Sequence, residues 1–540
     1  MQKIKVAIHN RAYNSWEFTQ DDVKVDIPHL IPSKHKLLHD DIVLFNGETI
    51  VIVESPFRDA VLAGVLILSK TYGRLGKRLL YKCIPDNRAL PVFLVPYTVD
   101  ATFSKVVNNK YIVFRFVDWD NEHPHGEIKD TLGDVNSLEA FNEYQLYRRG
   151  LHLSLTPFVK ASRIILKDSD PIQKIMDKTN YCINDLRFIK NVFTIDPADC
   201  TDFDDAFSVS EENSVATINI YIANVFVWLE TYSLWEHMTD RVSTIYLPDK
   251  KRPMLPPLLS DNLCSLKQGE DRFAFMMSVK YDMATLEQID KPIFKNVLIN
   301  IKKNYDYEDP KLEKNPAYKA LKTLAKTDDS HDVVAFWMIH MNVSAAEHLR
   351  SEGKGIFRTS EGENILEKPM FKGGGISLSK AAPLGELVLP ATYSKVCAPH
   401  SQLGVDAYVH ITSPIRRLVD ILNQILFQSN VSELCQAFLD KWIQKLDLVN
   451  RATKEIRKAQ MDCELLVLAE KNELSEFSGI LFDQNLVKGQ YEYAVYIEKL
   501  KLFSRIKLDE CIENFTKSQF RIFVFDDEDR LSKKIRLKLN

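Results

Sequence analysis

Several features that would place this chain in a familiar class are missing from its sequence. No two of its eight cysteines form a Cys-x-x-Cys pair, which argues against a zinc ribbon and against a disulfide framework. No stretch of 18 or more apolar residues occurs, and the first residues carry no apolar run of the signal-peptide type. We therefore expect no membrane span, and we expect an intracellular, cytoplasmic protein with reduced cysteines.

The chain also lacks a strong excess of charge. It has 70 basic and 74 acidic residues, so its formal net charge is only −4. Any surface that binds nucleic acid must therefore come from local clustering of basic residues. With only 18 glycines in 540 residues, long flexible linkers are not expected, and the 45% apolar content is enough to form sizeable cores.

The pattern of short segments predicts an α+β protein of several domains. Alternating apolar segments separated by turn-prone pairs such as Asn46-Gly47 are typical of small all-β units and cover the first 150 residues. The middle of the chain mixes helical and strand patterns, with helices predicted near 331–350, 414–428 and 432–475. We predict two N-terminal barrels at 1–60 and 61–150, a mixed catalytic domain at 151–475 and a C-terminal barrel at 476–540.

Basic and aromatic residues recur together in two of the predicted barrels. Phosphates need cations and bases need flat stacking partners, so this combination suits single-stranded nucleic acid, although aromatic residues in strands are often core residues. The candidates are Arg74, Lys77, Arg78, Lys82, Phe93, Tyr97, Phe103 and Lys105 in the second barrel, and Tyr491, Tyr493, Tyr496, Lys499, Lys501, Phe503, Arg505 and Lys507 in the last.

The segment FTIDPADCTDFDDAFSV is the strongest local signal of chemistry. Asp196, Asp202, Asp204 and Asp205 fall within ten residues, between two β-prone runs. Clustered carboxylates repel one another unless a cation or a buried proton offsets the repulsion, and Mg²⁺ prefers a few carboxylates together with substrate phosphate. The spacing does not fit an EF-hand calcium loop, and the alternative is a solvated acidic loop.

A second motif, VHITSPIRRLVDILNQILF, predicts an anion site. Ser413 and Pro414 form an N-cap and first-turn pair, which would place Arg416 and Arg417 in the first turn of a helix. A cation is unfavourable there, so the pair indicates a bound anion, and phosphate is the natural candidate. A salt bridge to Asp420 or to a neighbouring domain is the alternative.

Together with the irregular, proline-rich stretch VSTIYLPDKKRPMLPPLLSDNLCSLKQGEDRFAF, these motifs resemble the RNB family, which includes ribonuclease II, ribonuclease R and the catalytic subunit of the exosome. The motifs IDP…DFDDA, IYLP…PMLP…LCSL…DR and H-x-TSPIRR follow the family's order, and the match is closest to eukaryotic members or viral relatives of them. The resemblance covers about 60–540. It implies a mixed RNB catalytic domain flanked by OB-type barrels, two cold-shock-like ones before it and an RNA-binding one after it.

The resemblance also implies roles by position. The four aspartates would hold Mg²⁺, with two ions about 4 Å apart and Mn²⁺ as a possible substitute. Asp204 would be central to the chemical step, Tyr246 would stack on a base near the 3′ end, and Arg416 would hold the scissile phosphate beside Arg417. The expected reaction is hydrolysis of single-stranded RNA from its 3′ end to 5′-mononucleotides, by a monomeric catalytic unit with no protein partner indicated.

Three departures from the family pattern affect this expectation. The arginine helix lacks the family's later His-Arg pair and has Gln424 and Ile425 there. The family's Glu-Glu-aromatic-Met is Ala335, Phe336, Trp337 and Met338 here, and one of those glutamates is thought to help grip the terminal ribose. The usual His-x-Ala-Asp-Val has Tyr221 and Asn224 at the His and Asp positions. The alternatives are a catalytically weak RNA-binding or scaffold protein, a DNA exonuclease of the same fold and a phosphohydrolase acting on small molecules.

Overall fold

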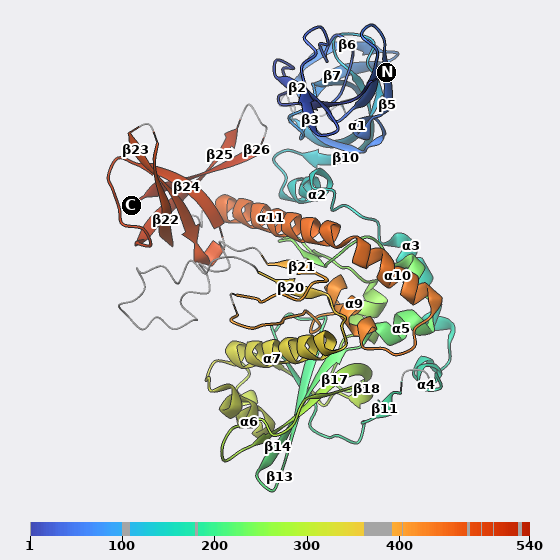
Figure 1. Cartoon of the computed structure of the whole chain (residues 1–540), viewed down its shortest axis with the longest axis vertical. Helices are drawn as coiled ribbons and strands as arrows, with labels where there is room; N and C mark the ends of the chain where they lie inside the picture. The colour runs from blue at the N-terminus through green and yellow to red at the C-terminus, as the bar shows by residue number, and fades with distance from the viewer. Residues whose placement is uncertain are drawn as a thin grey trace. The chain divides into compact units, whose positions relative to one another are not determined.

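The chain folds into three β-rich regions and one mixed α/β region (Figure 1). The computed structural model describes residues 2–540 except 100–107, 179–181, 361–390, 402, 472–475, 488, 501 and 528–531. By internal contacts the chain divides into two units, one of residues 1–152, 247–250 and 455–540, the other of 153–246 and 251–454. The finer division into four domains stays a prediction.

The first unit begins with a five-stranded antiparallel sheet and a closed barrel. The sheet has the strand order β3-β2-β1-β4-β5, and the barrel has the order β10-β8-β7-β6-β9, closed by a parallel contact between β10 and β8. The predicted turn at Asn46-Gly47 joins two neighbouring strands, with Asn46 Oδ1 accepting from the Glu48 and Thr49 amides. Buried apolar residues of the five-stranded sheet and of the closed barrel form one hydrophobic core. The elements are β1 (Gln2–Ile8), β2 (Trp16–Gln20), β3 (Val23–Val25), β4 (Ile42–Phe45), β5 (Ile50–Glu54), α1 (Pro56–Asp59), β6 (Leu62–Leu75), β7 (Arg78–Pro85), β8 (Phe93–Tyr97), β9 (Lys110–Asp118), β10 (His125–Asp134) and α2 (Leu138–Arg148).

The C-terminal part of this unit is a five-stranded antiparallel sheet of order β24-β23-β22-β25-β26. Tyr493 and Tyr496 are buried in it, as Phe93 is in the barrel, so these three aromatic rings are core residues and cannot stack on bases. Phe103, Lys105 and Lys501 lie outside the described residues, as does the side chain of Phe503. The strands are β22 (Phe477–Val487), β23 (Gln490–Ile497), β24 (Leu502–Leu508), β25 (Lys517–Asp527) and β26 (Ser532–Leu539).

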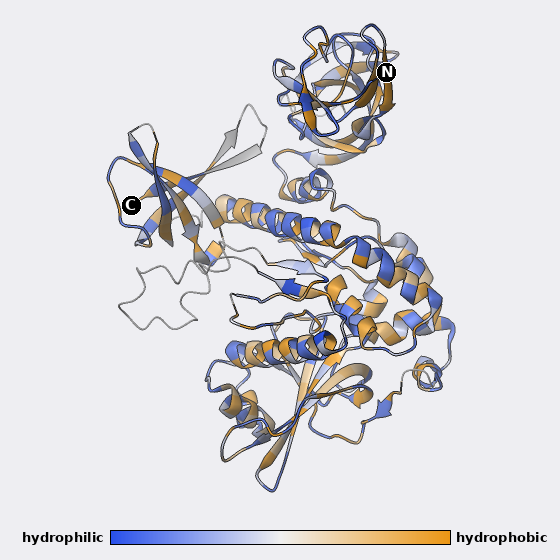
Figure 2. Ribbon diagram, viewed as in Figure 1, coloured by the Kyte–Doolittle hydropathy of each residue, from blue (hydrophilic) through white to orange (hydrophobic). Residues whose placement is uncertain are grey.

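The second unit is built on a seven-stranded mixed sheet of order β11-β18-β17-β14-β13-β12-β19. Along β14 (Val215–Ala223) alternate residues are buried as far as Ile220. From Ile220 to Ala223 every residue is buried, so both faces of the strand are covered there. Figure 2 shows hydrophobic residues concentrated on these central strands, as expected of a sheet packed against helices. The strands are β11 (Asn184–Asp185), β12 (Phe193–Asp196), β13 (Asp205–Glu212), β14 (Val215–Ala223), β17 (Asp271–Asp282), β18 (Ile293–Asn300) and β19 (Lys303–Asp306).

Helices cover this sheet, and two short hairpins extend from it. The helices α6 and α7 pack on one apolar face, and α7 spans Ser330–Ser351, which confirms the helix expected near 331–350. The helix expected near 432–475 is wrong as a single element, because the chain leaves the helix at Lys445 and a second helix follows. The remaining elements are α3 (Thr156–Ser162), α4 (Pro171–Met176), α5 (Val225–Thr231), β15 (Ile245–Tyr246), β16 (Lys251–Arg252), α6 (Pro316–Ala325), β20 (Phe357–Thr359), β21 (Thr392–Ser394), α9 (Leu418–Leu426), α10 (Glu433–Gln444) and α11 (Leu446–Glu470).

The α+β architecture of a mixed region flanked by small β structures therefore agrees with the expectation from sequence. Within the described ranges, no helix combines the length and the apolar character needed to span a lipid bilayer. All eight cysteines are free thiols in the structure.

Two neighbouring residues on α7 test the packing of this helix. Trp337 is fully buried, packs edge-on against Tyr281 and donates from Nε1 to the Leu321 carbonyl at 3.3 Å, whereas Phe336 is 39% exposed. We expect Trp337→Ala to lower the free energy of unfolding by about 3–5 kcal/mol, because a large cavity is left in the core. Phe336→Ala should lower it by less than about 1 kcal/mol. Urea denaturation followed by circular dichroism measures both, and equal losses would contradict the packing described here.

Candidate active site

The acidic loop lies between two strands of the seven-stranded sheet. Strand β12 ends at Asp196 and β13 begins at Asp205, so the four aspartates lie on the loop and at both strand ends. The Phe203 amide donates to Ser265 Oγ at 3.0 Å, and Ser265 is fully buried. Ser265 belongs to the Leu-Cys-Ser-Leu segment of the proline-rich stretch. The sequence signalled this segment without indicating that its serine anchors the acidic loop.

The arginine motif forms a turn that precedes a helix. Helix α9 begins at Leu418, and the Arg416 and Arg417 amides donate to the Ser413 carbonyl at 3.2 and 3.0 Å. The prediction that Ser413 caps a helix containing both arginines in its first turn is therefore wrong. The Ser413 amide donates to the buried carboxylate of Asp420 at 2.7 Å, and this hydrogen bond within the motif replaces the expected cap.

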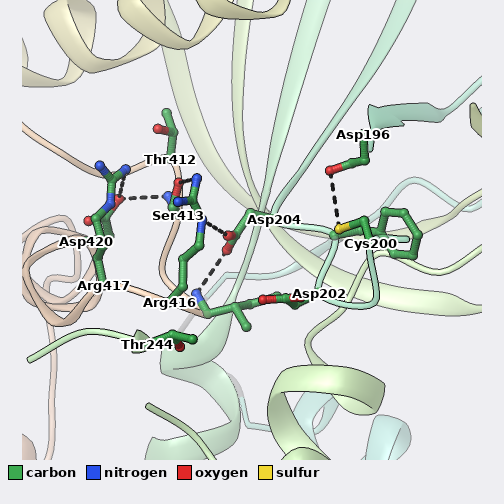
Figure 3. Close-up of polar contacts among 12 residues, drawn as sticks. Asp196, Cys200, Asp202, Asp204, Thr244, Thr412, Ser413, Arg416, Arg417 and Asp420 are labelled. Carbon is green, nitrogen blue, oxygen red and sulfur yellow. Dashed lines mark hydrogen bonds and ion pairs between the residues drawn. The ribbon is translucent and has the colours of Figure 1, made fainter. Parts of the chain in front are cut away.

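Asp204 and Arg416 meet where the acidic loop and this turn come together (Figure 3). Asp204 is only 4% exposed, and both of its carboxylate oxygens are used. Oδ1 accepts from the Ile415 amide at 3.0 Å, and Oδ2 accepts from Arg416 Nε at 3.1 Å. Arg416 Nη2 also donates to Ser413 Oγ at 3.1 Å, while the side chain of Arg416 stays 45% exposed. Two residues of separate sequence motifs thus form one charged contact.

Arg417 has a different environment from Arg416. Its Nη2 donates to Asp420 Oδ1 at 3.0 Å, and Arg417 pairs with Ser243 through an isolated β-bridge. Because Asp420 is completely buried, loss of Arg417 would leave an uncompensated charge inside the protein. The sequence left open a salt bridge to Asp420 as the alternative to a bound anion. The structure contains this salt bridge for Arg417.

Asp202 is held by the β15–β16 hairpin. The hydroxyl of Tyr246 donates to Asp202 Oδ2 at 3.1 Å, and Lys251 Nζ donates to Asp202 Oδ1 at 3.0 Å. Burial lowers the pKa of Lys251, but its hydrogen bonds to Asp261 and Asp202 raise that pKa more, so the ammonium is charged at neutral pH. Tyr246 is 42% exposed, and nothing in the sequence indicated that Lys251 contacts Asp202.

Asp196 and Asp205 have fewer hydrogen-bond partners than Asp202 and Asp204. Asp196 is 9% exposed, and in each of these two residues Oδ2 is buried with no hydrogen-bond partner within the described part of the chain. The thiol of Cys200 donates to Asp196 Oδ1 at 3.8 Å (Figure 3). Burial raises the pKa of Asp196 to about 6, and burial followed by the charges of Asp196 and Asp204 raises the pKa of Asp205 well above its ordinary value.

These orphaned oxygens make the acidic cluster a fitting site for a divalent cation. Buried carboxylates without partners cost free energy unless they are protonated or bind a cation. Among the described residues, no three His, Cys, Asp or Glu side chains are already arranged to hold a metal ion. A bound cation would therefore require some of the aspartate side chains to turn, with Asp196 and Asp205 the two that have oxygens free to do so.

The residues at the three departures from the family pattern have structural roles. Gln424 is buried and donates from Nε2 to the Ala223 carbonyl at 2.9 Å. Asn224 caps α5 and donates to Asn296 Oδ1 at 2.9 Å. Tyr221 shares a hydrogen bond with Ser208, whereas Ala335 is exposed and offers no carboxylate.

Comparison with known proteins agrees with this geometry. Residues 183–318 and 381–433 match the RNB domain, so the segments that carry the acidic loop and the arginine turn both fall within it. Ribonuclease R of Chlamydia pneumoniae is 28% identical over 331 residues, 47% of this chain and 49% of that protein. The human exosome complex exonuclease RRP44 is 28% identical over 251 residues, 46% of this chain and 25% of that protein.

Solved structures share the fold across the chain. Mycoplasma genitalium RNase R in complex with ribose-methylated single-stranded RNA covers 100% of both chains, with a TM-score of 0.71 and 17% identity. Yeast Ssd1, described as a pseudonuclease, covers 96% of this chain and 80% of its own, with a TM-score of 0.59 and 13% identity.

The chain shares its fold with these solved structures, so the expected α+β fold, a mixed region flanked by small β units, is confirmed. Two of its segments match the RNB domain, in agreement with the resemblance to the RNB family. It spans about half the length of the bacterial ribonuclease R that it matches and a quarter of the length of the human relative.

The buried aspartates predict how stability depends on pH. Burial raises the pKa of Asp204 to about 7, although Arg416 and the Ile415 amide oppose the shift, and an unfolded aspartate titrates near pH 3.9. Between these values the folded chain binds more protons than the unfolded chain, so Asp204 makes stability fall as the pH rises. We expect the melting temperature in EDTA to fall less steeply between pH 5 and 8 for Asp204→Asn than for the wild type.

The matched control for this measurement is Asp199→Asn. Asp199 lies in the same loop but is exposed, so its amide variant should keep the wild-type slope. Differential scanning fluorimetry over the pH range measures all three proteins. Identical slopes for the wild type and Asp204→Asn would contradict the buried, proton-binding state of Asp204.

Proposed function

We propose that this chain is a 3′-to-5′ hydrolytic exoribonuclease that degrades single-stranded RNA to 5′-mononucleotides with a divalent cation, Mg²⁺ or in its place Mn²⁺. The observation that carries the proposal is the contact between Asp204 and Arg416, which joins the acidic loop to an exposed guanidinium. The RNB domain and the exonuclease relatives support the reaction and its direction.

Each polar group at this contact has a definable task. Arg416 uses Nε and Nη2 within the protein, and its Nη1 makes no hydrogen bond to any described residue. A half-exposed guanidinium with free N–H groups can bind a phosphate oxygen, and the planar fork fixes the direction of approach. The Ile415 amide and Arg416 together orient the carboxylate of Asp204, so phosphate and carboxylate are held side by side.

The neighbouring residues would position the RNA and the cation. Tyr246 has its hydroxyl anchored on Asp202, which fixes the exposed ring where a terminal base could stack on it. Asp196 and Asp205, with their unpartnered oxygens, would hold the cation together with Asp204. When bound, the cation supplies a Lewis acid for phosphodiester hydrolysis.

Substitution of Asp204 tests the proposed chemistry. We expect Asp204→Asn to bind RNA nearly as well as the wild type but to cleave it more slowly by a factor on the order of a thousand, because a carboxylate at the reacting phosphate is lost. A time course on 5′-labelled single-stranded RNA, with Mg²⁺ and with EDTA, measures the rate and the direction. The exposed loop variant Asp199→Asn should cleave normally, and near-normal cleavage by Asp204→Asn would refute the assignment.

Two substitutions of Arg416 separate a phosphate-binding role from a structural one. Arg416→Lys keeps the charge but loses the fork, whereas Arg416→Ala loses both. We expect both variants to bind long RNA almost normally and to lose most of the cleavage rate. The carboxylate of Asp204 is buried, so Arg416→Ala should also lower the melting temperature, whereas Arg416→Lys keeps a cation beside the carboxylate and should lower it less. A fully active Lys variant beside a strongly destabilised Ala variant would show that Arg416 is structural.

A second candidate function is RNA binding without cleavage. It is favoured by the exposed Ala335, which replaces a carboxylate of the family pattern, and by protein partners on both oxygens of Asp202 and of Asp204. The same time course separates the two functions, because tight RNA binding with no Mg²⁺-dependent cleavage would select the second. An all-deoxy strand of the same sequence tests whether the loss of that carboxylate relaxes the discrimination between ribose and deoxyribose.

A further inference from the structure

Lys251 carries a positive charge into the acidic cluster. Its ammonium donates to Asp202 Oδ1 at 3.0 Å, to Asp261 Oδ1 at 2.9 Å and to Thr201 Oγ1 at 2.7 Å. These three bonds use every proton of the ammonium. With its side chain only 26% exposed, Lys251 is a fixed component of the cluster and not a mobile surface lysine.

The hairpin explains why Lys251 lies there. In the β15–β16 pair, Lys251 is directly opposite Tyr246, and residues opposite each other in an antiparallel pair have side chains on the same face. Lys251 and Tyr246 each bind one oxygen of Asp202. The carboxylate of Asp202 therefore has a protein donor on each side.

The four aspartates consequently fall into two pairs. Asp202 forms an ion pair with Lys251, which Asp261 shares, and Asp204 forms an ion pair with Arg416. Asp196 and Asp205 have no such cation, and each retains a buried Oδ2 without a hydrogen-bond partner in the described ranges. Lys251 and Arg416, from other segments, thus pair with two aspartates of the acidic loop, and the other two aspartates have no such cation.

We propose that Lys251 is a built-in cation of the site, which neutralises Asp202 and leaves one position for a divalent cation, at Asp196 and Asp205. This inference rests on the proposed function, and it reduces the expected number of bound Mg²⁺ ions from two to one. Lys251 is a positioning residue, since it acts on the cation site through the Asp202 carboxylate. Its charge sets how many divalent cations the cluster accepts.

The number of bound Mn²⁺ ions tests this proposal directly. The full chain is stripped of metal and titrated with Mn²⁺, with binding measured by calorimetry and free Mn²⁺ by electron paramagnetic resonance. We expect the wild type to bind one ion. Lys251→Met removes the ammonium at similar length, so we expect a second ion to bind, or the single ion to bind at least about tenfold more tightly, because one negative charge is no longer compensated.

Three further variants serve as controls. Lys251→Arg retains the positive charge and should bind one ion like the wild type. Lys280→Met removes an exposed lysine on β17 and should change neither number nor affinity. Asp202→Asn keeps the ammonium of Lys251 but removes a negative charge beside it, so we expect at most one ion, bound more weakly than in the wild type.

Two results would overturn the proposal. One is a wild type that binds two Mn²⁺ ions or none, and the other is a Lys251→Met variant that binds Mn²⁺ as the wild type does. The RNA time course distinguishes this failure from failure of the proposed function. Mg²⁺-dependent cleavage by a wild type that binds two ions would leave the exonuclease intact and remove only the role of Lys251.

Discussion

The carboxylate of Asp204 is nearly inaccessible to solvent, and a buried carboxylate is tolerated only when other groups satisfy it. Here the satisfying groups are the Ile415 amide and the Arg416 guanidinium, from a turn more than two hundred residues further along the chain. That turn is closed by Asp420, which is itself completely buried. The contact therefore ties a loop of the central sheet to the start of α9, and the geometry of the whole site depends on it.

The surrounding elements keep the acidic loop from adopting other conformations. The Ala223 amide at the end of β14 donates to the Asp204 carbonyl, and the Leu266 amide donates to the Phe203 carbonyl. Ser265 accepts from the Phe203 amide on the same side. These hydrogen bonds hold the backbone of Phe203 and Asp204 in place, so the end of the loop is fixed by its neighbours.

The difference among the four aspartates gives the site its electrostatic character. Two aspartates are compensated by a lysine and an arginine, and two are left with buried, unpartnered oxygens. An acidic loop with equal exposure at every residue would attract cations only weakly, because water would screen it. Here partial burial concentrates the uncompensated charge at Asp196 and Asp205, beside a guanidinium that can bind phosphate.

The sequence by itself determined the features that depend on local pattern. It predicted the strands on either side of the aspartates, the helix that contains Trp337, the two clusters of charged residues and the class of fold. Only the tertiary structure decided how those clusters are used. The contact of Asp204 with the Ile415 amide and the placement of Lys251 on Asp202 join distant segments, and the start of α9 at Leu418 follows from competition for the buried carboxylate of Asp420. No local periodicity records such contacts, because a hydrogen-bond donor is drawn to whichever buried acceptor the fold brings within reach.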